Sequence, residues 1–121
     1  MPYTSDTFNN SNRKAEVNAA AAGSTGRTAL QAAAGGGQLA VVERLLQGKA
    51  DVNAAVAWVY GRTALRAAAE GGHLAVVERL LQQGANVNAA AGYYGRTALQ
   101  AAAEEGHLVV GERLRMAGAK D

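Results

Sequence analysis

The sequence predicts an all-α solenoid of three helix-turn-helix units joined by extended finger loops. The first observation is a repeated segment, Gly-Arg-Thr-Ala-Leu, which begins at Gly26, Gly61 and Gly95. The copies are 35 and 34 residues apart, and a fixed period of this length is typical of stacked repeat units. The second observation is that each copy holds two short helical patterns separated by a glycine-containing turn. One such unit cannot bury its apolar face alone, so each is expected to stack on the next.

The middle copy shows how each unit is built. Thr63 precedes a run of strong helix formers, and its hydroxyl can cap the first free amide groups. Gly71 and Gly72 then favour the end of this helix, because glycine tolerates the left-handed conformation of a helix C-terminus. A second helix is expected over about 73–83, ended by Gly84, with an extended finger after it. Its apolar residues fall at helical spacing: Leu74, Val77, Leu80 and Leu81.

The domain organisation follows from this repetition. Residues 1–14 are polar and aperiodic, so we expect an N-terminal tail there and a repeat domain over 15–121. The predicted divisions of that domain are a partial unit over 15–25 and units over about 26–60, 61–94 and 95–121. The predicted helices are 28–35, 38–47, 63–70, 73–83, 97–104 and 107–117.

A set of positions in the middle unit carries a family resemblance. These positions are Gly61, Thr63, Leu65, Ala68, Ala69, Gly72, His73, Val76, Val77, Leu80, Leu81, Gly84, Ala85, Val87 and Asn88. With this pattern the chain resembles the ankyrin repeat family over residues 15–120. Ala64 and Arg66 stand where the family usually has proline and histidine, and the fingers are slightly longer than usual. The resemblance implies a non-catalytic module that binds a protein or peptide partner through its fingers and concave face.

The aromatic residues of the chain lie outside the predicted helices. Two are in the N-terminal tail, and the others are predicted at the tips of two fingers. Large amphipathic rings on projecting loops are good recognition anchors. The predicted anchors and their apolar neighbour are Trp58, Val59, Tyr60, Tyr93 and Tyr94. The alternative is that Tyr60 and Tyr94 pack between adjacent fingers.

An arginine precedes the first helix of every unit, at Arg27, Arg62 and Arg96. If these side chains line up along the concave edge, they form a basic strip for an acidic peptide. The alternative is that they reflect duplication of the unit, or pairing with a neighbouring backbone. Arginine suits such pairing because its guanidinium is a planar fork.

Other charged residues of the first helices differ between units. Arg66 stands where the other units carry Gln31 and Gln100, which makes it a more specific candidate for partner binding. Glu70 and Glu104 would make the C-terminal half of the concave rim acidic. The alternative for these two carboxylates is an ordinary solvated turn.

Several kinds of site are not supported by the sequence. His73 and His107 have no matched set of acidic ligands, so we expect structural hydrogen bonds between turns and no metal site. Neither a phosphate-binding glycine motif nor a Ser-His-Asp set is present, so no cofactor and no catalysis are expected. The net charge of +2 does not suggest nucleic acid. Without a long apolar run or a signal-like N-terminus, no membrane contact and an intracellular location, cytoplasmic or nuclear, are expected.

The first and last units differ in their second helices. In the last unit, Gly111 and Arg115 stand where the middle unit has Val77 and Leu81, and this loss of apolar residues suggests a cap. The first unit keeps its full apolar stripe, which we expect to be exposed: Val41, Val42, Leu45 and Leu46. An exposed apolar patch usually marks an interface, so a homodimer through the N-terminal unit is one hypothesis, and the alternative is that Tyr3 and Phe8 of the tail fold back as a cap. Another is a consensus-like engineered scaffold without a native ligand, because the units are so similar.

Overall fold

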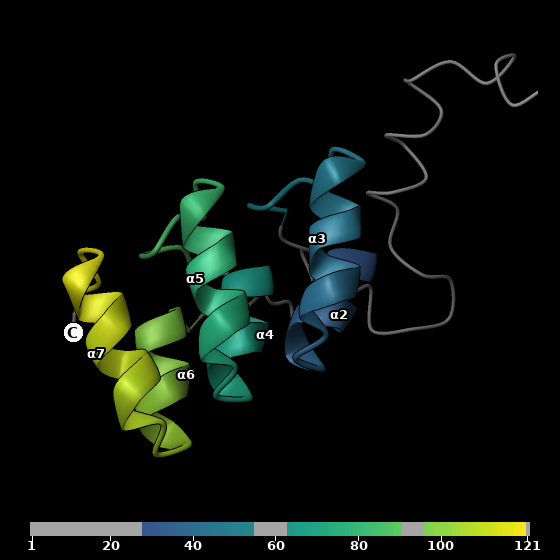
Figure 1. Cartoon of the computed structure of the whole chain (residues 1–121). Helices are drawn as coiled ribbons and strands as arrows, with labels where there is room; N and C mark the ends of the chain where they lie inside the picture. The colour runs from purple at the N-terminus through teal and green to yellow at the C-terminus, as the bar shows by residue number, and fades with distance from the viewer. Residues whose placement is uncertain (1–27, 55–62, 91–95, 121) are drawn as a thin grey trace, which may run out of the picture.

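The computed structural model describes residues 28–54, 63–90 and 96–120, which form six α-helices and no β-strand (Figure 1). The helices are α2 (Ala29–Gly35), α3 (Leu39–Gln47), α4 (Ala64–Glu70), α5 (Leu74–Gln82), α6 (Ala98–Glu104) and α7 (Leu108–Met116). The all-α repeat prediction is therefore confirmed, and each helix bound is within one residue of the prediction. The predicted tail 1–14 and the partial unit 15–25 lie outside the described residues.

Each first helix begins after a threonine that caps it. The hydroxyls of Thr28, Thr63 and Thr97 accept hydrogen bonds from the backbone N–H three residues later, at 3.2, 3.1 and 3.2 Å. An N-cap of this kind satisfies one of the amide groups that have no partner inside the helix. The same local sequence thus fixes the start of the helix in all three units.

A glycine in the left-handed conformation separates the two helices of a unit. In the middle unit this residue is Gly72, with φ of +71°. Its N–H donates to the carbonyl of Ala69, and the N–H of His73 donates to that of Ala68. These bonds satisfy the last carbonyls of α4 and turn the chain back into α5.

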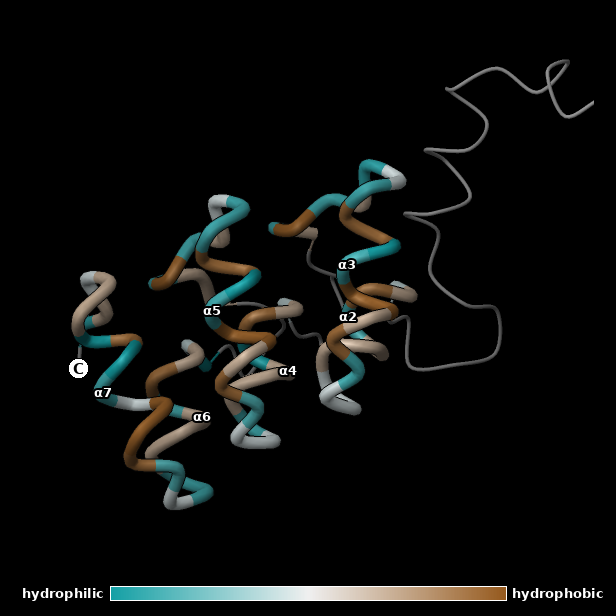
Figure 2. Tube along the Cα trace, viewed as in Figure 1, coloured by the Kyte–Doolittle hydropathy of each residue, from teal (hydrophilic) through white to brown (hydrophobic). Residues whose placement is uncertain are grey.

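The helices form two rows. The first helices α2, α4 and α6 pack side by side, and each second helix packs on the first helix of its own unit. Alanines on the first helices permit close stacking: a Cβ atom added at Gly35 of α2 would lie 3.5 Å from that of Ala67 in α4. Along α3 and α5, apolar and polar stretches alternate, as expected for helices with one buried side (Figure 2). The largest buried apolar side chains are Leu30, Leu65, Leu80, Leu114, Val42, Val76 and Val77.

Two sets of polar contacts join the loops of neighbouring units. The Nε2 atoms of His73 and His107 lie 3.1 and 3.0 Å from the carbonyl oxygens of Gly35 and Glu70, the last residues of the preceding first helices. The predicted turn-to-turn hydrogen bond is confirmed. Asn53 and Asn88 form the second set, which the sequence analysis did not identify. Their Nδ2 groups donate to Gly84 and Gly118 carbonyls, each at 3.1 Å.

A third set of contacts joins the second helices. Arg79 of α5 donates to Glu43 of α3 over 3.1 Å, and Arg113 of α7 donates to Glu78 of α5 over 3.2 Å. Glutamates of α3 and α5 thus each pair with an arginine of the following unit. We call this repeated pairing the Glu-Arg ladder.

The prediction of an exposed stripe on the first unit is wrong for two of its four residues. Val42 and Leu46 are buried in the core. Val42 is on the inner side of the solenoid, where its counterpart Val77 is also buried. Of the predicted stripe, only Val41 is exposed, at 43%, while Leu45 is half-buried.

The most exposed large apolar residues among those described are in the last unit, which the sequence suggested to be a cap. They are Leu108, Val109 and Met116, at 77%, 64% and 82%. The counterparts of Leu108 in the other units, Leu39 and Leu74, are half-buried, so Leu108 lacks the cover that they have. The position therefore faces a following unit, and the described chain provides none after α7.

Candidate partner-binding face

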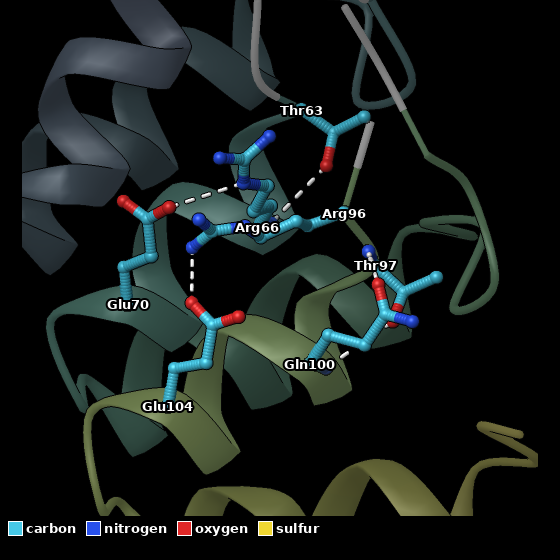
Figure 3. A network of polar contacts seen from close by, with 7 residues as sticks. All are labelled: Thr63, Arg66, Glu70, Arg96, Thr97, Gln100 and Glu104. Carbon is cyan, nitrogen blue, oxygen red and sulfur yellow. Dashed lines mark hydrogen bonds and ion pairs between the residues drawn. The ribbon is translucent and has the colours of Figure 1, made fainter. Parts of the chain in front are cut away.

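The residues predicted to bind a partner fall into two groups. The finger group lies outside the described residues: Trp58, Val59, Tyr60, Arg62, Tyr93 and Tyr94. The helix group is described, and its four members gather around the first helices α4 and α6 (Figure 3). These four are Arg66, Glu70, Arg96 and Glu104. We call the surface formed by α2, α4 and α6 the first-helix face.

Arg66 changes the local structure of α4. In α2 and α6, the side-chain oxygens of Gln31 and Gln100 accept from the N–H of the capping threonine, at 2.8 and 3.0 Å. Arginine has no acceptor, so Arg66 cannot complete this capping box. Its Nε instead donates to Glu70, four residues later, at 3.0 Å.

The Arg66–Glu70 pair is largely enclosed. The side chains of Arg66 and Glu70 are 10% and 23% exposed. Although the sequence predicted Arg66 as a direct contact for a partner, the structure buries it. Its visible role is to hold the carboxylate of Glu70 at the end of α4.

Arg96 and Glu104 form a second ion pair, which spans the length of α6 (Figure 3). Both side chains are about half exposed, at 46% and 49%. Arg96 lies just before the capping Thr97, and Glu104 is the last residue of the helix. This pair is therefore the most accessible described part of the predicted site.

The electrostatics of the face differ from the sequence-based expectation. The sequence suggested a basic strip that includes Arg96 and an acidic rim formed by Glu70 and Glu104. In the structure, each of the two glutamates is paired with an arginine, so the charges alternate and balance locally. Such a face offers oriented donors and acceptors to a polar partner and has little net attraction for a uniformly charged one.

Gln31 of α2 is buried and supports the face from within, a role that the sequence analysis did not identify. Besides completing the capping box, its Nε2 donates to the carbonyl of Ala54 at 2.9 Å. This bond ties α2 to the start of the following finger. The amide of glutamine makes this possible because it has both a donor and an acceptor.

The described residues offer no group of three or more His, Cys, Asp or Glu side chains that could hold a metal ion. The imidazoles of His73 and His107 are against backbone carbonyls, as described above. The chemistry that the face does present is hydrogen bonding and ion pairing on a rigid support.

The repeated architecture agrees with a comparison of the sequence with known families. A family model described as ankyrin repeats, in three copies, matches residues 7–91 and 55–120. The chain belongs to the ankyrin repeat family. Among curated proteins, no sequence matches it.

Membership of this family indicates the general role of such a repeat domain. Ankyrin repeats generally mediate protein–protein interactions, and the family is generally non-catalytic. In the described part of this ankyrin chain, no helix has the length and apolar character needed to cross a membrane.

Proposed function

We propose that this chain binds a protein or peptide partner through its finger tips and its first-helix face, without catalysing a reaction. The observation that carries the proposal is where the units differ. Their stacking residues repeat almost unchanged, whereas the last residue of the first helix is Gly35, Glu70 or Glu104. Because His73 and His107 contact only the backbone carbonyl at this position, its side chain can differ between units without changing that contact, and its variation suits a partner.

The rigidity of the support favours binding. The exposed Arg96–Glu104 pair is on a helix that is capped at its start and stacked on α4. Groups held in place before association lose less conformational entropy when a partner arrives. The Trp58 and Tyr93 side chains, which the sequence places on fingers next to this face, would supply the apolar anchors.

Affinity capture with matched variants tests the proposal. The finger variant carries Trp58→Ala and Tyr93→Ala, and the face variant carries Arg96→Glu and Glu104→Arg. The second exchange keeps the ion pair but reverses its direction, so folding should persist while charge recognition is lost. The control is Met116→Gln, because Met116 is 82% exposed on the second helix of the last unit, where other units have glutamine.

The expected result is a partner that the wild type and Met116→Gln capture equally and that both other variants lose. A captured partner is then titrated against each purified variant, with circular dichroism to verify folding. Equal affinity of all the variants for every captured protein would contradict binding through fingers and first helices.

A further inference from the structure

The two ends of the described solenoid each lack a neighbour. At one end, Leu108 of α7 is 77% exposed, whereas its counterpart Leu74 is half-buried. At the other end, Val41 of α3 is 43% exposed, whereas its counterparts Val76 and Val110 are buried. The first position faces a following unit and the second faces a preceding one. Each end therefore exposes an apolar residue that the opposite end of a second copy would cover.

The Glu-Arg ladder is open at the same two ends. Glu43 and Glu78 each receive an arginine from the following unit. Glu112 of α7 is the equivalent residue of the last unit, and it has no ion-pair partner among the described residues. Arg44 of α3 is the equivalent of Arg79 and Arg113, and it too has none there. Among the residues that the structure describes, one end thus lacks an arginine and the other lacks a glutamate.

We propose that this chain stacks head to tail on a second copy of itself. The first unit of one copy covers α7 of the next, in the arrangement by which α7 covers α5 within a chain (Figure 1). In this arrangement Arg44 of one copy pairs with Glu112 of the other, and Val41 approaches Leu108. The surface is distinct from the first-helix face, so both interactions can occur together.

A closed two-fold pair through α7 is disfavoured by charge. Glu112 is the middle residue of this nine-residue helix. In an antiparallel pair of α7 helices centred on this residue, the two Glu112 carboxylates would face each other, and Arg44 of both copies would stay without a glutamate among the described residues. Head-to-tail contact instead joins unlike surfaces, and such a contact continues from copy to copy unless its geometry closes a ring.

Arg115 limits the strength of this stacking. It takes the place of Leu46, which is buried, and of Leu81, which is half-buried and packed against the core. A charged side chain at an apolar contact position lowers the apolar area that a second copy can bury. The proposed association is therefore weak, and Arg115→Leu should strengthen it by about tenfold.

Sedimentation equilibrium tests the apolar part of the contact. The mean mass of the wild type should rise continuously from micromolar to millimolar concentration, past that of a dimer. Leu108→Ser should weaken association by about tenfold, because stacking would bury this side chain. Val109→Ser is the matched control, since its counterparts Ala40 and Ala75 are exposed even where a following unit is present. A monomer at every concentration, or equal effects of the two substitutions, would overturn the proposal.

Charge reversal tests the ladder at low ionic strength. Arg44→Glu alone places glutamate against Glu112, and Glu112→Arg alone places arginine against Arg44. Each variant should associate about fivefold more weakly, because exposed ion pairs contribute modestly. In a mixture, contacts between the two unlike variants have opposite charges at both ends, so these contacts should recover the wild-type affinity. Failure of the mixture to recover, or a dimer mass that neither substitution changes, would refute head-to-tail stacking.

Discussion

The second helices of the first and middle units have the same nine residues but different environments. Both α3 and α5 read Leu-Ala-Val-Val-Glu-Arg-Leu-Leu-Gln. Leu80 of α5 is fully buried, whereas the equivalent Leu45 of α3 is half-buried. The difference comes from the neighbours, because α5 lies between α3 and α7. In a solenoid, the stability that a side chain provides depends on its position in the stack as much as on its own identity.

The largest expected effect tests this comparison directly. Leu80→Ala should lower the free energy of unfolding by about 2–5 kcal/mol, because it leaves a cavity between units. Leu45→Ala makes the same chemical change at a half-buried position, and we expect about 1–2 kcal/mol. Denaturant unfolding of both variants measures the difference. Equal losses would mean that the first unit is covered as fully as the middle one.

The second comparison concerns two glycines in the left-handed conformation. Gly72 and Gly106 occupy the same place in successive units, with φ of +71° and +76°. A Cβ atom at Gly72 would come within 2.6 Å of the His107 ring, whereas one at Gly106 would meet nothing within 4 Å. Both Gly→Ala substitutions carry the backbone penalty of about 1–2 kcal/mol.

Gly72→Ala must in addition displace His107 from the carbonyl of Glu70. Loss of that hydrogen bond adds about 1 kcal/mol, so Gly72→Ala should cost more than Gly106→Ala. Thermal unfolding of both variants provides the measurement. If His107 were unimportant for stacking, the two melting temperatures would coincide.

Gly111 distinguishes the last unit from the other two. It lies inside α7, where α3 and α5 carry the buried Val42 and Val77. A Cβ atom at Gly111 would be 3.7 Å from Cδ1 of Leu99, an ordinary contact. Gly111→Ala should therefore stabilise the chain by about 1 kcal/mol through helix propensity. A loss of stability in denaturant unfolding would show that α6 and α7 are packed too closely for a methyl group.

The helices and turns could be predicted from the sequence because their signals are local. A threonine before each first helix and a glycine after it fix the two ends within a few residues of chain. The repeat period then predicted stacking without any knowledge of individual contacts. His73 and His107 were correctly assigned to turn-to-turn bonds because the sequence gives them no matched set of metal ligands, and both follow the glycine that ends a first helix.

Other features depend on which unit lies next to a residue, and the sequence pattern does not show this. Val42 was predicted to be exposed because the stripe was treated as a single face. In the structure, Val41 faces the preceding unit, whereas Val42 lies on the inner side. The ladder was missed for a similar reason: Glu78 and Arg113 are 35 residues apart, and only stacking brings them together.

The smallest expected effect concerns the turn after each second helix. Gly84 and Gly118 have φ of +87° and +100°, but the first unit has Lys49 there, with φ of +71°. A left-handed backbone costs a non-glycine residue about 1–2 kcal/mol. Glycine avoids this cost, but it raises the conformational entropy of the unfolded chain, and this entropy offsets part of the gain in stability. Lys49→Gly should therefore raise the free energy of unfolding by about 0.5–1 kcal/mol.

The reciprocal substitution sharpens the test. A side chain at Gly84 would have nothing within 4 Å of its Cβ atom, so Gly84→Lys changes little except the backbone preference. It should destabilise the chain by about the amount that Lys49→Gly stabilises it. Denaturant midpoints at unchanged slope give both values. If Gly84→Lys is costly while Lys49→Gly is neutral, Lys49 makes a compensating contact that the other two turns do not need.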